Sequence, residues 1–387
     1  MYYFSLSDPL FSRIEKDLEL RKEENLFRKL TIPVSCRLNL SSNDYLQLRN
    51  HPSVISSARA AMEKYGTSSS ASPLLTGYLP CHEELIDSLL QWKNKPAGML
   101  FNSGFMANQA LIKNLPGRKD LILVDRLIHN SINQALLQSK AKFKRYRHLD
   151  INDLEKLLKK NHSKYETVFV ITESVFSMDG DYPDLFKIAS LKSSYPFIFI
   201  LDEAHGTGVY GESGGGLAEE MNVLNHVDIL VGTLGKALAS TGAYVLTHNK
   251  SIIDYLINYS DEFIYSTFLS PAQAGSATAA ISLVKSMNEP REKLKSNAVW
   301  FRQELKERGW GGDDFDSPII PLIVGSPENG KELIKKFLRK GILIPFIRPP
   351  TVPANSSRFR FSLHTGITRE NLLEVLEIIG PCKNIPA

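Results

Sequence analysis

Lys236 is the residue whose setting most clearly points to chemistry. It lies in "GTLGKAL" (232–238), directly after an apolar run that predicts a buried strand. A lysine in this setting serves a phosphate-binding loop, forms a Schiff base with a carbonyl cofactor, or lies in an ordinary surface turn. A phosphate loop needs the spacing G-x-x-x-x-G-K-[S/T], but here Leu230 stands five residues before Gly235, and Ala237 follows the lysine. The Schiff-base role and the surface turn remain.

A second motif favours a different class of protein. The stretch "LDEAH" (201–205) follows a strand-like run and resembles the acidic box of certain helicases. Such an enzyme also needs the phosphate loop, and this chain offers none. A nucleotide- or nucleic-acid-binding protein is therefore kept only as a remote alternative.

The Schiff-base role requires partners for pyridoxal 5'-phosphate: a carboxylate for the ring nitrogen, an anion cradle for the phosphate and a flat group against the ring. Asp202 ends the run "FIFILD", and His129 in "DRLIHNS" follows another predicted strand. The turn "FNSGF" (101–105) leads from a strand into a helix, whose N-terminus binds anions. Taken singly, these features have plain explanations as helix caps and loop residues. Together they favour a pyridoxal phosphate site.

Short apolar runs alternate with helical patterns and predict the elements that position these residues. Continuous apolarity is typical of strands buried on both faces of a largely parallel sheet. The runs are 97–101, 121–125, 167–173, 197–203, 228–236 and 242–247. Between them, residues 153–160 predict a crossover helix. After residue 270, a long helical stretch precedes a portion (318–363) that resembles a βαβ unit and predicts a second, smaller domain.

Composition sets broad limits on the protein. The 387 residues are 43% hydrophobic and 23% charged, as in globular proteins. The net charge of +4 is interpreted as a small excess spread along the chain. Three separated cysteines favour a reducing compartment, and no apolar run approaches the length of a membrane span. We therefore expect a cytoplasmic protein with no membrane, nucleic-acid or metal partner.

Several segments in order resemble the α-oxoamine synthases, pyridoxal phosphate enzymes of the aspartate aminotransferase fold. They are "SSNDYL" (41–46), "NSGFMAN" (102–108), "DRLIHNS" (125–131), "TESVFSMDGD" (172–181), "LDEAHGTGVYGESGGG" (201–216), "GTLGKAL" (232–238) and "IYSTFLSPAQ" (264–273). The resemblance implies an α/β fold of type I with a mostly parallel seven-stranded sheet. It divides the chain into an N-terminal arm (1–45), a large cofactor-binding domain (46–285) and a small α+β domain (286–387).

The resemblance also implies a set of cofactor-binding residues: Gly104, Phe105, His129, Glu173, Ser177, Asp202, His205, Thr233, Lys236, Ser266 and Thr267. Lys236 would form the Schiff base, Asp202 would pair with the ring nitrogen, and His129 would stack on the ring. Ser266 and Thr267 would reach the cofactor of a neighbouring subunit, which requires a homodimer.

The remaining cofactor contacts are assigned by the same resemblance. The backbone of Gly104 and Phe105, with Thr233 beside them, would bind the phosphate. Ser177 and His205 would lie near the phenolic oxygen of the ring.

For the substrates, the resemblance implies Arg28, Asn43, His129, Thr351 and Arg360. Arg360 would hold the amino acid's carboxylate with Asn43 nearby, since a guanidinium binds a carboxylate through two parallel hydrogen bonds. Arg28 and Thr351 would contact the acyl portion. Arg358 and Arg360 alternate along a predicted strand, so both also fit the plain interpretation as surface charges.

The stretch "FIRPPTVPANSSRFRFSL" (346–363) indicates a branch of the family. It is similar to the branch that condenses L-alanine with a pimeloyl thioester, of coenzyme A or of acyl carrier protein, in biotin biosynthesis. Branches that use glycine or serine with another acyl-CoA remain the alternative. The loop "GTSSSASPLLTGY" (66–78) departs from the family's glycine-rich pattern, which leaves acyl selectivity open.

Overall fold

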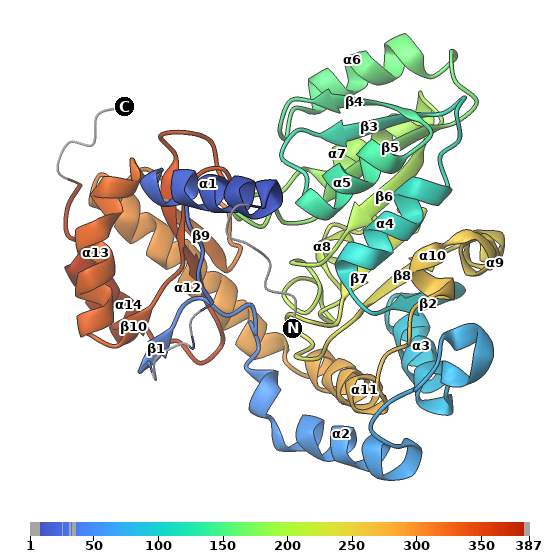
Figure 1. The fold of residues 1–387 in the computed structure, drawn as a ribbon, viewed down its shortest axis with the longest axis horizontal. Helices are drawn as coiled ribbons and strands as arrows, with labels where there is room; N and C mark the ends of the chain where they lie inside the picture. The colour runs from blue at the N-terminus through green and yellow to red at the C-terminus, as the bar shows by residue number, and fades with distance from the viewer. Residues whose placement is uncertain (1–7, 25, 31, 33–35, 383–387) are drawn as a thin grey trace.

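The computed structural model describes residues 8–24, 26–30, 32 and 36–382, and the remainder of the predicted N-terminal arm lies outside them. Figure 1 shows a larger group of elements around a central sheet and a smaller group built on β9 and its neighbours. The boundary predicted at 285/286 falls between helices α11 (Pro271–Lys285) and α12 (Asn288–Glu307).

The central sheet has seven strands in the order β2-β8-β7-β6-β5-β3-β4. They are β2 (Ala97–Phe101), β3 (Leu121–Asp125), β4 (Lys142–Tyr146), β5 (Val168–Glu173), β6 (Ile198–Asp202), β7 (Ile229–Thr233) and β8 (Ala243–Thr247). Strands β4, β3, β5, β6 and β7 are parallel, and β8 is antiparallel to β7 and β2. The predicted apolar runs all form strands here, because buried Val, Ile and Leu side chains pack on both faces of a covered parallel sheet.

Strand β4 has no counterpart among the predicted apolar runs. Its sequence "KFKRY" is mostly charged, and only Tyr146 is fully buried. It is the last strand of the sheet and pairs with β3 alone. An edge strand needs little apolar surface, and lysines on such an edge oppose pairing with another chain.

Helices cover the sheet on both faces. They are α2 (Pro52–Tyr65), α3 (Pro80–Trp92), α4 (Gly104–Asn114), α5 (Asn130–Gln138), α6 (Ile151–Asn161), α7 (Leu185–Ser190), α8 (Leu217–Glu220), α9 (Lys250–Tyr259), α10 (Asp261–Ile264) and α11 (Pro271–Lys285). Helix α6 shows how the sequence defines such a helix. The Asp150 side chain caps its N-terminus by accepting from the Asp153 amide, and Leu154 and Leu158 face the core. Single helical turns occur at Leu48–Asn50, Pro73–Gly77, Leu191–Ser193 and Leu224–His226.

The smaller group of elements differs from the predicted βαβ unit. Its strands are β9 (Ile319–Gly325), β10 (Ile342–Leu343), β11 (Phe346–Ile347) and β12 (Ser357–Ser362), and its helices are α12 (Asn288–Glu307), α13 (Pro327–Arg339) and α14 (Arg369–Ile379). Strand β12 is antiparallel to both β9 and β11. Strand β10 instead pairs in parallel with β1 (Leu38–Asn39), so the N-terminal segment supplies the partner that the βαβ interpretation assigned to β9.

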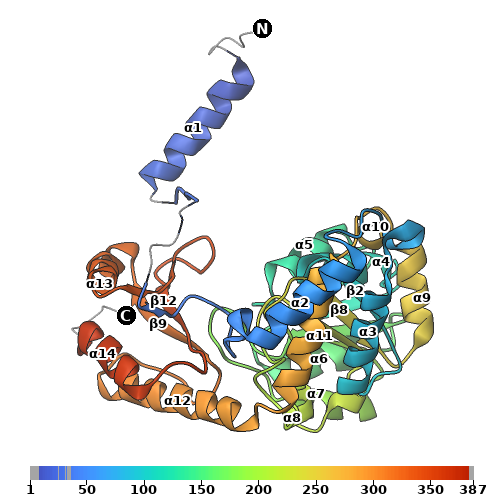
Figure 2. The same ribbon diagram turned by 90° about the horizontal axis from the view of Figure 1, so that it is seen from below.

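Helix α1 (Pro9–Glu23) stands away from both groups in Figure 2, and none of its residues is buried. Among the residues that the structure describes, no helix is both long enough and apolar enough to cross a membrane.

His148, two residues after β4, joins this strand to β3 and to the loop that follows β5. Its Nδ1 lies 2.8 Å from Oδ1 of Asp125, the last residue of β3, and its Nε2 lies 2.8 Å from Oδ2 of Asp181 in the loop after β5. Burial opposes the charged ring, but the two carboxylates outweigh it and raise the pKa of His148 to about 9. Because this pKa lies above that of an unfolded histidine, the stabilisation is complete below about pH 6.5 and is lost as the pH rises through about 9.

We therefore expect His148→Gln to lower the melting temperature most at about pH 6, with a difference from wild type that shrinks toward about pH 10. Thermal melts across this range measure it. His226→Gln, at an exposed histidine in the turn Leu224–His226, is the control and leaves the pH profile unchanged. A His148→Gln deficit that stays constant with pH contradicts the charged bridge.

Candidate active site

A cavity of about 200 Å³ opens at the carboxyl ends of β5, β6 and β7, where an open α/β sheet places its ligands. Its lining is Gly104, Phe105, Asn108, His129, Ser131, Glu173, Asp202, Ala204, His205, Val231, Gly232, Thr233 and Lys236. Eight of the predicted cofactor residues are among them. Ser177, Ser266 and Thr267 are not.

Lys236 follows β7 in a tight turn, in which Gly235 N donates to Thr233 Oγ1 at 3.1 Å. Its Nζ lies 2.7 Å from Nε2 of His205, which comes three residues after β6. Burial, reinforced by the charge of Arg360, lowers the pKa of Lys236 to about 8, although the carboxylates of Asp202 and Glu173 oppose the shift. About a tenth of this amine is therefore uncharged at pH 7, far more than for a lysine of ordinary pKa.

His205 is buried, and burial together with the Lys236 charge holds its pKa well below the ordinary value. The ring is therefore neutral and accepts from the protonated amine. Its Nδ1 lies 2.7 Å from the hydroxyl of Tyr45, which fixes the ring orientation.

Asp202 ends β6 with both carboxylate oxygens engaged. Oδ1 accepts from Ala204 N and Oδ2 from Asn108 Nδ2, each at 2.9 Å. Asn108 also donates to Ser131 Oγ at 3.0 Å. The sequence interpretation missed Asn108, although it lies in "NSGFMAN" four residues after Gly104, on the same face of α4.

His129 caps α5, and its Nδ1 lies 2.8 Å from Ser131 Oγ. Its backbone amide donates to Glu173 Oε1 at 2.6 Å. Burial lowers the pKa of His129, which favours a neutral ring. Glu173 is the register partner of Asp202 across β5 and β6, and burial with that neighbouring charge raises its pKa well above the usual range.

The N-terminus of α4 lies at one end of the cavity. Gly104 and Phe105 occupy the first two helical positions, whose amides have no acceptor within a helix. The hydroxyl of Ser103 accepts from Met106 N at 3.2 Å and leaves these two amides toward the cavity. A side chain at Gly104 would meet no atom within 4 Å, so the space in front of the helix is open.

Arg360 lies on β12 and is buried, as is Arg358, so the interpretation of these two residues as surface charges was wrong. Arg360 Nε donates to the Ser177 carbonyl at 2.5 Å, and Nη1 donates to Asn43 Oδ1 at 3.2 Å. Arg358 instead pairs with Asp179. The backbone oxygen of Ser177 therefore binds Arg360, and its side chain does not.

A hydrogen-bonded path joins Arg360 to the cavity. The Asn43 side chain that accepts from Arg360 also accepts from the Tyr45 hydroxyl at 3.3 Å, and Tyr45 continues to His205 and Lys236. Tyr45 lies within "SSNDYL", but the sequence interpretation gave it no role. The predicted substrate residues Asn43 and Arg360 are thus brought to the same site as Lys236.

Arg28 and Thr351 lie in a different cavity of about 310 Å³ beside β11, which Arg348 and Phe346 also line. Arg28 Nη2 donates to Thr351 Oγ1 at 3.3 Å. These two predicted acyl contacts are therefore together, but they do not line the cavity that contains Lys236.

Ser266 and Thr267 lie between α10 and α11. Asn102 Nδ2, directly after β2, donates to Ser266 Oγ at 2.9 Å and to the Thr267 carbonyl at 2.6 Å. The loop at 66–78, whose sequence differs from the family's glycine-rich pattern, borders this region, because Phe268 N donates to the Ala71 carbonyl. Residues 66–78 do not line the Lys236 cavity, whereas Pro73, Leu74 and Tyr78 line a separate one.

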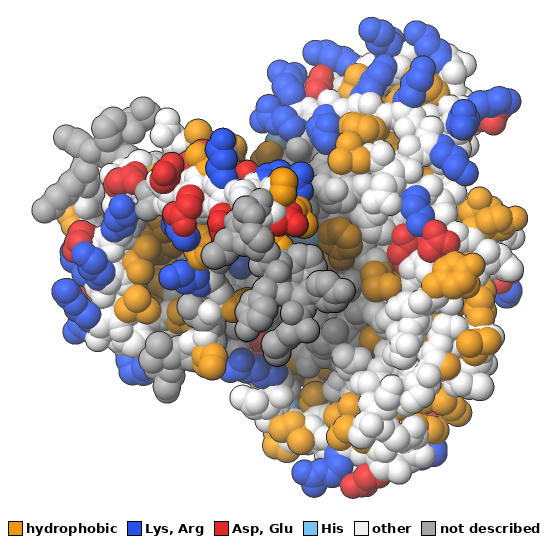
Figure 3. Space-filling model, in the orientation of Figure 1, with side chains coloured by type: hydrophobic (Ala, Val, Ile, Leu, Met, Phe, Trp, Pro, Cys, Tyr) orange, Lys and Arg blue, Asp and Glu red, His pale blue; other side chains and the backbone are white. Residues whose placement is uncertain are grey.

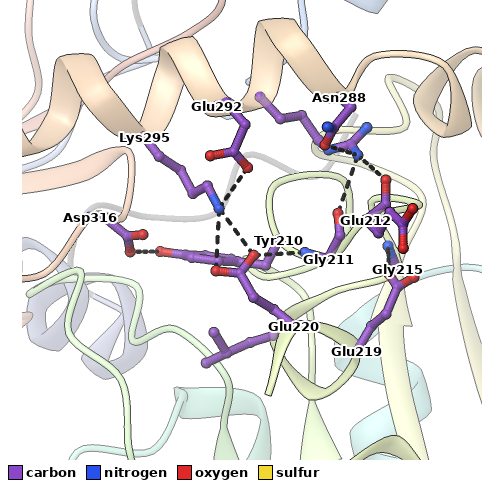
Figure 4. A network of polar contacts seen from close by, with 12 residues as sticks. Tyr210, Gly211, Glu212, Gly215, Glu219, Glu220, Asn288, Glu292, Lys295 and Asp316 are labelled. Carbon is purple, nitrogen blue, oxygen red and sulfur yellow. Dashed lines mark hydrogen bonds and ion pairs between the residues drawn. The ribbon is translucent and has the colours of Figure 1, made fainter. Parts of the chain in front are cut away.

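A polar network holds α12 against the loop that follows His205 (Figure 4). Lys295 lies between Glu220 and Glu292, at 3.1 and 2.9 Å. The buried Arg291 donates to the carbonyls of Gly211 and Glu212. The hydroxyl of Tyr210 donates to Asp316 at 2.8 Å, and Tyr182 donates to the same oxygen at 3.0 Å. These contacts fix β9, which pairs with the strand that carries Arg360.

Residues 37–379 match the family model described as aminotransferase class I and II. An 8-amino-7-oxononanoate synthase of Geobacter sulfurreducens is 39% identical over 363 residues, covering 90% of this chain and 92% of that protein. One from Geotalea daltonii is 42% identical over 328 residues, covering 84% and 83%.

Two solved structures have a similar fold. A serine palmitoyltransferase with PLP is 25% identical with a TM-score of 0.88, covering 97% of each chain. The 8-amino-7-oxononanoate synthase of Francisella tularensis is 28% identical with a TM-score of 0.77, covering 88% of this chain and 96% of that one. These likenesses confirm the predicted fold class. The chain therefore belongs to the aminotransferase class I and II family and, within it, to the 8-amino-7-oxononanoate synthases.

Proposed function

We propose that this protein condenses L-alanine with a pimeloyl thioester to give 8-amino-7-oxononanoate, CO₂ and the free thiol carrier, using pyridoxal 5'-phosphate. The observation that carries the proposal is the contact between Lys236 and His205, with the carboxylate of Asp202 on the same cavity. The names of the relatives supply the reaction type.

The residues of the cavity fit this cofactor. The N-terminus of α4, at Gly104 and Phe105, offers amides to a phosphate, and the Thr233 hydroxyl lies on the same cavity. Asp202, fixed by two donors, would hold the proton of the ring nitrogen. Lys236 would hold the cofactor covalently.

When bound, pyridoxal 5'-phosphate supplies a carbonyl carbon for amines and a ring that takes up the electrons released at the amino acid's Cα. Lys236, with its pKa lowered to about 8, is suited to accept the Cα proton and to return one later. His205 holds the lysine nitrogen in place at 2.7 Å. The neutral His129 would stack on the ring and donate a hydrogen bond to the oxyanion that forms when the thioester is attacked.

Arg360 would hold the carboxylate of L-alanine. The bonds to the Ser177 carbonyl and to Asn43 fix the guanidinium before substrate arrives, which reduces the ordering cost of binding. The cavity of Arg28, Arg348 and Thr351 would receive the distal carboxyl group of the pimeloyl chain, because two guanidinium groups there complement a carboxylate.

The proposal includes a cytoplasmic homodimer. Leu74, Leu75, Phe105 and Tyr265 are 52%, 78%, 46% and 80% exposed, and apolar exposure of this kind is typical of an interface. In a dimer, Ser266 and Thr267 would complete the phosphate site of the other subunit. The three cysteines are free, which fits a reducing compartment. Sedimentation that finds only monomer at micromolar concentration contradicts the dimer.

A substrate panel tests the reaction. L-alanine, glycine and L-serine are each combined with pimeloyl, succinyl and palmitoyl thioesters, and CO₂ and free thiol are measured. The proposal expects the highest kcat/KM for L-alanine with the pimeloyl thioester. Preference for glycine or serine with another acyl group would move the protein to another α-oxoamine synthase activity.

The lowered pKa of Lys236 predicts how the apoprotein captures its cofactor. Only the neutral amine reacts, so the rate of covalent capture should rise up to about pH 8 and then level off, well below the pKa of a free lysine. Visible absorbance follows the capture, and borohydride trapping with mass spectrometry locates it.

Lys236→Ala should abolish both capture and turnover, whereas Lys250→Ala, at an exposed lysine on α9, should change neither. A capture rate that climbs without levelling to about pH 10 would contradict the lowered pKa.

Arg360→Lys is expected to raise KM for L-alanine about 10- to 100-fold, because one charged hydrogen bond is worth about 1.5–3 kcal/mol. Capture of the cofactor should be unchanged. Arg358→Lys on the same strand is the matched control, since Arg358 pairs with Asp179, and it should leave KM for L-alanine near the wild-type value. Steady-state kinetics with varied L-alanine decide between the two arginines.

A further inference from the structure

The positive charge of this chain is concentrated in one segment, contrary to the expectation that it is spread along the sequence. Residues 140–164 contain nine of the 46 Lys and Arg residues and three of the 42 Asp and Glu residues, a net charge of +6. The rest of the chain, with 37 basic and 39 acidic residues, carries −2. Such asymmetry creates a local field that attracts an acidic partner.

Part of the segment, the side of β4 that faces α6 together with the exposed side of α6, forms one surface, which we call the β4–α6 basic face. Figure 3 shows blue side chains gathered where Figure 1 places α6 and β4. On β4 its exposed member is Lys142, which lies on the same side of the strand as Lys144, the lysine that donates to Asn161 of α6. On α6 its exposed members are Lys156, Lys159 and Lys160. The three lysines are spaced three and four residues apart and share the side of α6 opposite the buried Leu154 and Leu158.

Protection of the sheet edge explains only part of this face. Lysines on an edge strand oppose pairing with another chain, which accounts for Lys142. It does not account for the lysines of α6, whose backbone is already paired within the helix. Asp153, one of the acids on α6, is engaged by the Arg147 backbone amide and side chain and does not neutralise those lysines.

Helix α6 begins at the carboxyl edge of the sheet, where the cavity opens, and runs back toward the amino ends of the strands. Strand β4 is three strands from β6 in the sheet, about 15 Å at the usual spacing of neighbouring strands. At the end of β4, His148 bonds to Asp125 and Asp181, so this edge is joined to the loop that contacts Arg358 and Arg360. A partner on the face could deliver a long flexible arm to the cavity.

We infer that the β4–α6 basic face is the docking surface for an acidic acyl carrier protein, which presents the acyl group as a thioester on its phosphopantetheine arm. This inference rests on the proposed function and specifies the carrier. The nucleotide of coenzyme A is compact and is satisfied by a few cations, whereas this face extends along a strand and a helix.

Charge reversal on α6 tests the inference, with a matched pair on α13 as control. Lys156→Glu with Lys160→Glu reverses two exposed lysines four residues apart. Lys336→Glu with Lys340→Glu does the same at the end of α13, in the smaller group of elements. Initial rates are measured for wild type and both variants with pimeloyl carrier protein and with pimeloyl-CoA, at low and high salt.

For the α6 variant we expect KM for the carrier-protein thioester to rise at least about tenfold at low salt, with kcat and all coenzyme A kinetics within about twofold of wild type. The α13 variant should match wild type. High salt should raise the wild-type KM for the carrier protein toward that of the α6 variant, because ions screen surface charges.

Three results would overturn the inference: an unchanged KM for the carrier protein in the α6 variant, an equal loss with both thioesters, or equal effects of the α6 and α13 reversals. Binding of unacylated carrier protein, measured by surface plasmon resonance, separates this inference from the reaction. Binding that the α6 reversal weakens supports docking even if no thioester turns over, whereas turnover without such binding overturns docking alone. Binding of a generic RNA, lost in the α6 variant while carrier kinetics stay unchanged, would assign the face to nucleic acid instead.

Discussion

The desolvated contact between Lys236 and His205 is the interaction on which the rest of the site depends. A charged ammonium in a buried cavity is costly, and this burial shifts Lys236 toward its neutral form. Asp202 and Glu173 work against the shift, so the amine keeps a pKa of about 8 rather than losing its basicity. The result is a nitrogen that both reacts as an amine and holds a proton.

Several layers keep this nitrogen where it is. His205 is fixed by Tyr45, and the loop that follows it packs against a buried Glu203, whose carboxylate accepts from the amides of Leu217 and Ala218. A side chain at Gly206 would approach that carboxylate to 2.1 Å, which explains the glycine. Lys93, fully buried, donates to Thr207 and to the Gly215 carbonyl of the same loop. The side chains of Glu203 and Lys93 thus hold this loop in position.

The same loop also joins the two parts of the molecule. Tyr210 donates to Asp316, and the carbonyls of Gly211 and Glu212 accept from Arg291 of α12. Ser317, close to Asp316, donates to the Gly180 carbonyl in the loop after β5. Arg360 reaches the site from β12 only because β9 is held in this way. The distance between the Lys236 amine and Arg360 is therefore set by contacts between residues 79 to 137 positions apart in sequence.

The sequence alone determined the elements whose residues are buried on both faces and the short motifs at their ends. Apolar runs predicted six strands of the central sheet, because such burial demands continuous Val, Ile and Leu, and the residues that follow these strands had to meet at one edge. Lys236, Asp202, His129 and the turn at Gly104 were found in this way. Each lies at the end of a strand or within four residues of it, so local position was enough.

Only the tertiary structure decided what depends on pairing across the chain. The edge strand β4 carries too few apolar residues to be recognised, and β10 pairs with β1 although a local pattern favoured β9. Asn108 and Tyr45 act through partners that no spacing reveals, and Arg360 lies buried beside Asn43 although its alternation with Arg358 fitted a solvent-exposed strand equally well. The lysines of α6 joined Lys142 in one surface only when α6 packed beside β4. Hydrogen bonds and fields act through space, and sequence distance does not record which side chains meet.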